Sequence, residues 1–440
     1  MSIEMQETLL KAYDPPKPWT ERWFSPITHG SLRMTILFLV TTATGAGFLA
    51  MPLTMQTSGI TAGLLMMSYA IWAAYENIIM TGRCFLVLGH SHLSEIVDYV
   101  GGSRLQRIVL GFMSLAACMN IVLHNVLLVQ ISAFFLQIIG IIDELPDYNN
   151  PFSTFRICAI LLLAGIQGVI FIKTPSPEKM KIYSFLSLAS VIYTIIVLVA
   201  EFPAYLRAYW SWDEVKLGIH LSQETIRDVG VYQFSFIMSA NIIIGIYNLR
   251  NPIERRISKV AKRSSVVLAF LYLPVAIIGY LSTLSNTPSV IVNRDPLEGM
   301  ATWPMQIARC GLAFTLLTAN ITCYASLRSV LTQFLLIGKE SKSNIDKNAS
   351  SLLQDILTII GITVVGLFLS QIITTMSFVG GTTGTIIFCL PLLVALRAPE
   401  FQLSKLKKVE LRILLVITIC FGIHNVFFDL GVYFGLIQEQ

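Results

Sequence analysis

The chain has 440 residues, of which 54% are hydrophobic and only 13% are charged. An ordinary soluble domain carries about 25% charged residues, so this composition excludes a water-soluble globular protein and predicts an integral membrane protein surrounded by lipid. The formal charge of +5 is small and can be assigned to loops on one side of a membrane, so nucleic-acid binding is not expected.

The predicted elements begin after a short tail. Residues 1–30 are rich in proline and charge and contain no apolar run, so they predict a cytoplasmic tail without a cleavable signal peptide. Residues 31–440 then supply repeated runs of about 20 apolar residues, the length that a helix needs to cross a bilayer, and they predict a single transmembrane domain of a polytopic all-α protein. The eleven predicted spans are at about 33–57, 61–83, 107–140, 154–172, 183–206, 231–249, 264–285, 303–337, 352–374, 376–396 and 410–436.

The distribution of basic residues predicts the orientation of this multi-pass protein. An odd number of spans places the two termini on opposite sides of the membrane, and cytoplasmic loops carry an excess of lysine and arginine. Most of the 31 basic residues fall on the N-terminal side, including the run from Arg250 to Arg263. The opposite loops keep only Arg207, Lys216, Arg227 and Arg294. We therefore expect a cytoplasmic N-terminus.

The first span has a weak point at its centre. Its central residues are Thr41, Thr42, Ala43, Thr44, Gly45, Ala46 and Gly47. Transporters built on inverted repeats often unwind a helix at the bilayer midplane, because the unwound backbone offers free N–H and C=O groups to a substrate or an ion. The alternative is that Gly45 and Gly47 are small-residue packing positions between helices.

The sixth span has a matching weak point. It consists of Ser239, Ala240 and Asn241, with Phe234 and Phe236 before them. An asparagine at mid-bilayer is costly unless it has a partner or a function, so Asn241 is either a site residue or one end of an interhelical hydrogen bond. Matching weak points in spans one and six divide the chain into two halves of five helices. These halves cover about 33–206 and 231–396, and an extra helix follows at about 410–436.

Two further spans carry polar stripes that point into the bundle. The stripe residues are Asn120 and His124 in span three and Thr315, Thr318 and Thr322 in span eight. His124 has two readings, as a proton relay or as a hydrogen-bonded structural histidine. Glu76, an acidic residue predicted inside span two, is either a coupling carboxylate or a partner of Asn77 or of a nearby helix.

Three segments resemble signatures of the amino acid/auxin permease family, which lies within the amino acid, polyamine and organocation superfamily. The first span supplies TTATGAGFLAMP, which is similar to the first-helix GxGxLxxP signature of that family. The sixth span and its basic follow-on supply YQFSFIMSANIIIGIYNLRNPIERRISKVAKRS, and the tenth span supplies SFVGGTTGTIIFCLPLL. The eighth span departs from the family pattern, because LTANITCYASLR has no proline and keeps only Arg328.

The resemblance implies a LeuT-like fold with a five-plus-five inverted repeat and an eleventh transmembrane helix. In that fold, spans one, three, six, eight and ten hold the substrate and expose it alternately to each side. The resemblance also implies that N–H groups after Thr44 receive an amino acid carboxylate, that carbonyl groups of spans one and six receive the ammonium, and that Phe234 or Phe236 closes over the side chain. The expected substrate-binding residues are Thr41, Thr44, Gly45, Ala46, Gly47, Asn120, Phe234, Phe236, Ser239 and Asn241.

The coupling ion has two candidates. The LeuT-like fold often binds sodium between spans one and eight, which implies a candidate Na⁺ site at Thr42, Thr315, Thr318 and Thr322. The alternative for these threonines is a hydrogen bond to a carbonyl group of their own helix. Proton coupling through Glu76 or His124 is the rival. No resident cofactor is expected.

We therefore expect a secondary active transporter, by symport, of small neutral amino acids. A buried cationic side chain usually requires a counter-charge, and no acidic residue lies near Ser239 or on the polar stripes. The alternatives are a transporter of a related amine or organic solute and an amino acid sensor with little flux. We expect a monomer in the plasma membrane or in a lysosomal or vacuolar membrane.

A membrane-embedded enzyme is the remaining class. Such enzymes display acidic or histidine clusters at a membrane face for metal or acid–base chemistry. The nearest candidates here are His90, His92, Glu95 and Asp98. They lie in a predicted amphipathic linker helix, so an enzyme is not expected.

Overall fold

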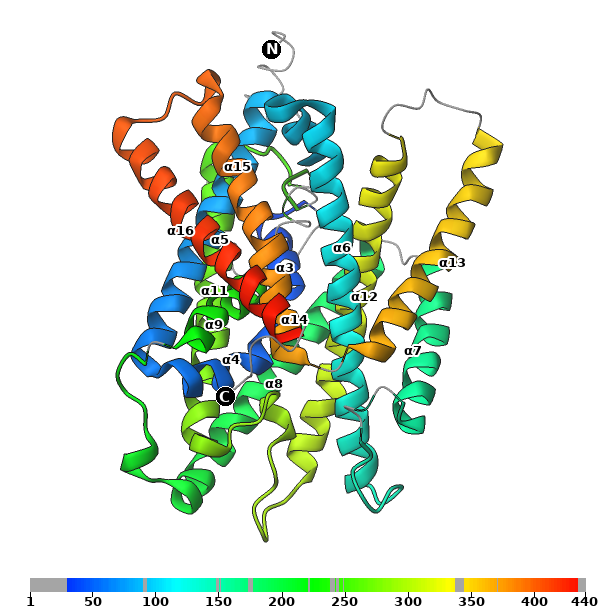
Figure 1. Cartoon of the computed structure of the whole chain (residues 1–440), viewed down its shortest axis with the longest axis vertical. Helices are drawn as coiled ribbons and strands as arrows, with labels where there is room; N and C mark the ends of the chain where they lie inside the picture. The colour runs from blue at the N-terminus through cyan, green and yellow to red at the C-terminus, as the bar shows by residue number, and fades with distance from the viewer. Residues whose placement is uncertain are drawn as a thin grey trace.

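The computed structural model describes residues 30–89, 93–147, 150, 152–172, 177–220, 222–237, 242, 245–247, 249–336, 344–369 and 371–433. All regular structure within these ranges is helical, and Figure 1 shows most helices running along the long axis of the molecule. The apolar composition explains this arrangement, since a helix satisfies every backbone hydrogen bond within itself and can therefore cross lipid.

The helices follow one another with short connections. Those before residue 222 are α3 (Leu32–Ala43), α4 (Gly47–Ser58), α5 (Ile60–Leu88), α6 (Leu93–Ile138), α7 (Thr154–Ile172), α8 (Pro177–Tyr209) and η1 (Trp212–Glu214). Those after it are α9 (Gln223–Ser235), α11 (Glu254–Thr283), η2 (Leu284–Asn286), η3 (Ile291–Asn293), α12 (Trp303–Leu336), α13 (Asn344–Phe368), α14 (Ile372–Val379), the π-helical η4 (Gly380–Gly384), α15 (Thr385–Arg397), η5 (Pro399–Phe401) and α16 (Lys405–Tyr433).

Several of these helices can span a membrane by length and composition. Within the described residues, seven helices meet that test, or eight if α3 and α4 count as one broken span bent by 57°. Each predicted span overlaps a helix, which confirms a polytopic all-α membrane protein. The count of eleven spans stays a prediction.

Two helix boundaries differ from the ends of the predicted spans. The sixth span was expected to begin near residue 231, but α9 begins at Gln223, where Ser222 and Thr225 form a reciprocal N-terminal cap. Arg227, expected in an outer loop, is therefore buried within this helix. The other boundary, expected near residue 375, lies between the end of α13 at Phe368 and the start of α14 at Ile372. The apolar run continues across it, so hydropathy alone could not locate it.

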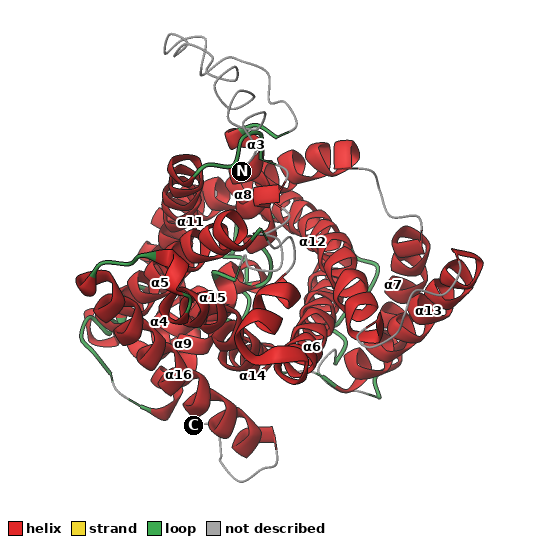
Figure 2. Ribbon diagram, turned by 90° about the horizontal axis from the view of Figure 1, so that it is seen from above, coloured by secondary structure: helices red, strands yellow, loops and turns green. Residues whose placement is uncertain are grey.

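The broken and long helices occupy the middle of the bundle. The pair α6 and α12 packs along much of its length, and α9 packs against α4, α14 and η4. Figure 2 shows α7 and α13 side by side at one edge, while α16 lies toward another. The central helices therefore place the breaks inside the protein.

Arg156 joins α7 to α13 at that edge. Its side chain is 1% exposed, although it is charged. Its Nε donates to the carbonyl oxygen of Leu367 at 3.1 Å and its Nη2 to that of Gly366 at 2.8 Å, with a further bond to Leu369. The last carbonyl groups of a helix lack partners within the helix and carry negative partial charge. The guanidinium therefore caps the C-terminal end of α13.

Candidate functional site

The first span is interrupted at the predicted weak point. α3 ends at Ala43, and α4 begins at Gly47 after Thr44 leaves the helical conformation with φ −74° and ψ 67°. Among the described residues, no acceptor bonds the backbone N–H groups of Ala46, Gly47 and Phe48. These groups lie at the positive end of the α4 dipole, which favours an anionic group such as a carboxylate.

Tyr272 of α11 connects this break to the end of α9. Its hydroxyl lies 2.7 Å from the carbonyl oxygen of Ala43 and 3.2 Å from that of Ser235, so it can donate to either. The ring is fully buried, stacks on Phe48 at 6.1 Å between centroids, and meets Phe236 edge-on at 5.1 Å. One side chain thus holds the last residues of α3 and α9 together.

The second half of the broken first span touches α9 at Gly47. A Cβ added to Gly47 would lie 2.7 Å from Cβ and 2.8 Å from Cα of Ser235, closer than side-chain atoms normally approach. Only glycine therefore permits this contact between α4 and α9. This geometry favours the packing role of Gly47, and its backbone N–H still belongs to the open end of α4.

His124 of α6 lies against the break. A Cβ added to Gly45 would lie 2.8 Å from Nε2 of His124, so that ring nitrogen faces the Gly45 backbone. The other ring nitrogen, Nδ1, lies 2.8 Å from Oδ1 of Asn320 on α12. Asn320 donates from Nδ2 to Oδ1 of Asn125 at 2.9 Å, and Gln167 of α7 donates to the same oxygen at 2.7 Å. All four polar side chains are buried.

This network assigns a tautomer to His124. Because Oδ1 of Asn320 can only accept a hydrogen bond, Nδ1 of a neutral imidazole must carry the proton. Nε2 is then an acceptor, and it faces the break. An acceptor in that place can receive an N–H of an ammonium group or take up a proton. Both readings of His124 therefore remain, and the network supplies the hydrogen bonds that a structural histidine needs.

The other predicted substrate-binding residues are distributed around the break. Phe236 is buried against Tyr272, and Phe234 lies on the side of α9 that packs against η4. Asn120 is half-buried one turn before His124. Ser239 and Asn241 lie outside the described residues.

The threonines of the candidate Na⁺ site bond to their own helices. The hydroxyls of Thr315, Thr318 and Thr322 donate to backbone carbonyls of α12 at 2.9, 2.9 and 2.7 Å. Thr42 does the same in α3 at 2.9 Å. Thr41 and Thr44, from the substrate set, also donate to carbonyls of α3. Each hydroxyl keeps lone pairs that could face a cation, so this arrangement leaves the Na⁺ site a prediction.

Glu76 lies in an ion pair between α5 and α16. Its Oε1 accepts from Nζ of Lys407 at 2.6 Å, and the same ammonium bonds Glu410 at 3.1 Å. Glu410 also accepts from the indole of Trp72 at 3.3 Å. The neighbouring Asn77 donates to the carbonyl of Ile387 at 2.8 Å instead. Of the two readings of Glu76, the geometry favours an interhelical partner.

This arrangement gives a testable prediction. Glu76→Gln is expected to lower the free energy of unfolding by about 1–2 kcal/mol, a value reduced because the Lys407 ammonium is partly exposed, while uptake stays within about threefold of wild type. Glu410→Gln, which leaves the bond between Glu76 and Lys407 in place, is the matched control with a smaller effect. Thermal unfolding and uptake would be measured on the same preparation. Loss of uptake at unchanged stability would instead identify a coupling carboxylate.

Three residues of this region were not predicted from the sequence. Asn320 lies between Thr318 and Thr322 in the sequence. A lone asparagine within an apolar run could have indicated a buried polar contact there. Tyr272 offered none, because its role depends on acceptors that are 229 and 37 residues away in the chain. Asp228 fell outside the predicted sixth span, yet it is buried in α9 and accepts from the Thr57 hydroxyl at 2.5 Å.

The fold is similar to that of a solved transporter. The crystal structure of the Eremococcus coleocola manganese transporter, in complex with an aromatic bis-isothiourea substituted compound, aligns with 97% of this chain and 92% of its own, with a TM-score of 0.58 and 10% identity. At that identity the likeness shows the fold alone. It confirms a transporter fold of LeuT-like type.

Sequence relatives point the same way. A Toxoplasma gondii protein named as an amino acid transporter, AAT1, is 27% identical over 71% of this chain and 43% of its own length. The sodium-coupled neutral amino acid transporter 10 named in Xenopus laevis is 23% identical over 64% of this chain and 28% of its length. Vacuolar amino acid transporter 2 of Saccharomyces cerevisiae is 22% identical over 69% and 62%. The chain thus spans less than two thirds of each of these relatives.

The family comparison covers nearly the whole chain. The family described as "transmembrane amino acid transporter protein" matches residues 28–434. This match confirms the resemblance carried by the motifs of spans one, six and ten, and it confirms that the chain is a transporter-family protein and not an enzyme. The chain therefore belongs to the transmembrane amino acid transporter family.

Proposed function

We propose that this chain is a secondary active transporter of small neutral amino acids, with its substrate site at the break between α3 and α4. The open N-terminal end of α4 carries the proposal, because Ala46, Gly47 and Phe48 have N–H groups without acceptors among the described residues and directly follow Gly45, whose backbone Nε2 of His124 faces. A zwitterionic amino acid needs donors for its carboxylate and acceptors for its ammonium, and this site offers both.

The charge distribution supports a neutral side chain. Glu76 is paired with Lys407, and Asp228 bonds Thr57 at the far end of α4. Neither carboxylate contacts the break, so a cationic substrate side chain would be buried there without a counter-charge. The carboxylate of the substrate binds at the α4 N–H groups, and its ammonium is shared between Nε2 of His124 and backbone carbonyls.

The proposed architecture follows the family. It comprises two inverted repeats of five helices, about 33–206 and 231–396, an eleventh helix at about 410–436, a cytoplasmic N-terminus and a monomeric assembly. Alternating access would move the halves of the broken spans about the fixed site. The name of the yeast relative supports a vacuolar membrane, and a lysosomal membrane and the plasma membrane are the other proposed locations.

Sodium or a proton drives the proposed symport. The name of the Xenopus relative supports sodium, for which Thr42, Thr315, Thr318 and Thr322 supply the candidate oxygen ligands. Thr315 also lies 3.4 Å from the carbonyl oxygen of Ser187, so α8 borders the same group of hydroxyls. Proton coupling would use His124.

Uptake by proteoliposomes that contain the full chain tests this proposal. Neutral, cationic and anionic amino acids and related amines would be offered with sodium and proton gradients imposed separately. We expect accumulation of neutral amino acids. Binding without flux would identify the sensor alternative, and accumulation only of an amine or a charged substrate would contradict the proposed cargo.

A variant and a matched control test the candidate Na⁺ site. Thr318→Val should raise the sodium concentration for half-maximal uptake about tenfold, the effect of losing an interaction worth about 1.4 kcal/mol. Thr363→Val is the matched control, because Thr363 makes the same bond to its own helix, at 2.7 Å, on peripheral α13. If uptake ignores sodium but responds to an acid-outside gradient, the sodium site fails and His124 becomes the coupling candidate.

A further inference from the structure

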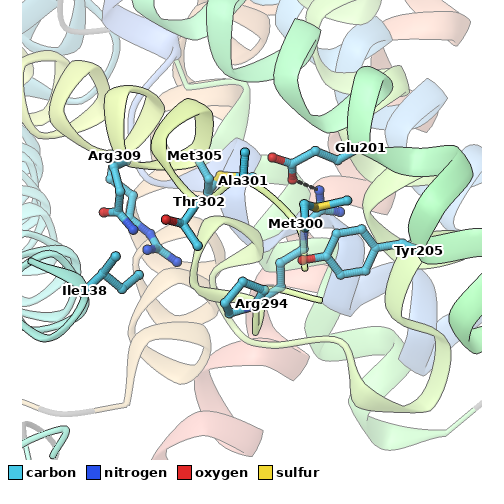
Figure 3. A pocket seen from close by; sticks show the side chains of 11 residues that line it. Ile138, Glu201, Tyr205, Arg294, Met300, Ala301, Thr302, Met305 and Arg309 are labelled. Carbon is cyan, nitrogen blue, oxygen red and sulfur yellow. Dashed lines mark hydrogen bonds and ion pairs between the residues drawn. The ribbon is translucent and has the colours of Figure 1, made fainter. Parts of the chain in front are cut away.

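A small pocket lies away from the break, at the end of α8 and the start of α12. Figure 3 shows Glu201 and Tyr205 of α8, Arg294 and Met300 of the connecting segment, and Arg309 of α12 around it. Its cavity volume is about 20 Å³. That volume accommodates one small particle, such as a water molecule or a monatomic ion, and excludes an amino acid.

One of the two arginines in the pocket is paired with an acid through its terminal nitrogens, although its Nε has no hydrogen-bond partner among the described residues. Arg294 forms an ion pair with Glu201 at 2.6 Å and donates to the Ser282 hydroxyl at 2.9 Å. Its guanidinium also lies 3.8 Å from the centre of the Tyr205 ring. The Glu201 carboxylate, the one acidic side chain in the lining, is therefore committed to Arg294.

The second arginine lacks such a partner. Arg309 is 1% exposed, its Nε donates to the carbonyl oxygen of Val292 at 2.9 Å, and its Nη1 has no hydrogen-bond partner among the described residues. Both amide atoms of Gln306, one turn before it, are buried without a partner as well. Glu201 and Asp295 both lie within electrostatic range of Arg309, but Glu201 forms its ion pair with Arg294, and Asp295 is exposed and outside the lining. Within the lining, two cations face one anion.

We propose that this pocket binds a small inorganic anion, with chloride as the matching species. Nη1 of Arg309 and Nε2 of Gln306 supply the donors, and a monovalent anion balances the net positive charge of the lining. The cavity is too small for a phosphate-sized ion or for a substrate carboxylate with its attached chain. The bound anion stabilises the packing of α12 against α8 and α6, since Arg309 also lies over the Phe134 ring of α6.

Thermal unfolding of the purified full chain tests the site. Sodium chloride would be titrated against sodium gluconate at constant ionic strength, with intrinsic fluorescence as the readout. We expect a saturable rise in Tm of about 2–4 °C with chloride for the wild type, because a ligand that binds only the folded state stabilises it. Arg309→Gln should abolish the rise. Arg83→Gln, which removes an arginine from a surface pair with Glu254, should leave it unchanged.

A second variant, which is expected to bind chloride more tightly, tests the proposal even if Arg309→Gln does not fold. Glu201→Gln removes the anionic group from the lining and frees the Arg294 guanidinium, so half-saturation should need at least about tenfold less chloride. A wild-type Tm that does not respond to chloride, an unchanged response in folded Arg309→Gln, or weaker chloride binding in Glu201→Gln would each overturn the proposal.

Discussion

Replacing Asn320 by leucine is expected to reduce amino acid uptake between about tenfold and 100-fold. Without the Asn320 oxygen, the imidazole of His124 loses the acceptor that holds its proton on Nδ1. The proton can then reside on Nε2, and the acceptor that faces the break becomes a donor that repels an ammonium. Loss of a hydrogen bond to a charged group is worth about 1.5–3 kcal/mol, which gives this range.

A graded control accompanies this prediction. Gln167→Leu removes the outer member of the network, but Asn125 still accepts from Asn320, so the orientation of His124 is kept and uptake should fall less. Initial rates over a range of substrate concentrations would be measured for both variants, with thermal unfolding as a check on folding. Equal losses in the two variants would contradict a role transmitted through the tautomer of His124.

Gly47→Ala is expected to abolish uptake and to lower thermal stability together. The new Cβ would overlap Ser235, so α4 and α9 must separate at their point of contact. Forcing an extra methyl group into a packed core costs about 1–3 kcal/mol. The obstacle at this position is thus helix packing, and a bound carboxylate is not required to explain the loss.

The double variant Gly47→Ala with Ser235→Gly isolates that contact. It removes the Ser235 side chain but leaves the Cα conflict at 2.8 Å, so partial recovery of uptake and Tm is expected. Gly111→Ala, in α6 with no atom near its added Cβ, is the matched control with little effect. Near-normal uptake by Gly47→Ala would mean that α4 and α9 are not in contact there.

The break could be predicted from the sequence because its cause is local. Glycines next to threonines at Thr44 and Gly45 weaken a helix wherever it packs, so the position followed from residue chemistry. The role of Asn320 could not be predicted, since it depends on how α12 is rotated against α6, and its partner His124 is 196 residues away in the chain. The threonines of span eight, which predicted the candidate Na⁺ site, lie on a different face of the same helix.

Long-range pairing also explains why the sequence could not decide whether Glu76 is a coupling carboxylate or an interhelical partner. Its partner Lys407 is 331 residues away and lies between the predicted spans ten and eleven, so the sequence alone offered Glu76 no counter-ion inside the membrane. Asp228 was missed for a related reason. The first turns of α9 are polar, and hydropathy places polar residues outside a span even when tertiary packing buries them.

Arg156 has a consequence for biosynthesis. Its acceptors on α13 are made 210 to 213 residues later in the chain, and at about 5–20 residues per second the ribosome needs about 10–40 seconds to reach them. During that interval α7 carries an arginine without those acceptors, and such a charge is costly in lipid. The final contacts of Arg156 therefore form only after α13 has been made, so α7 and α13 complete their packing as a late-forming pair.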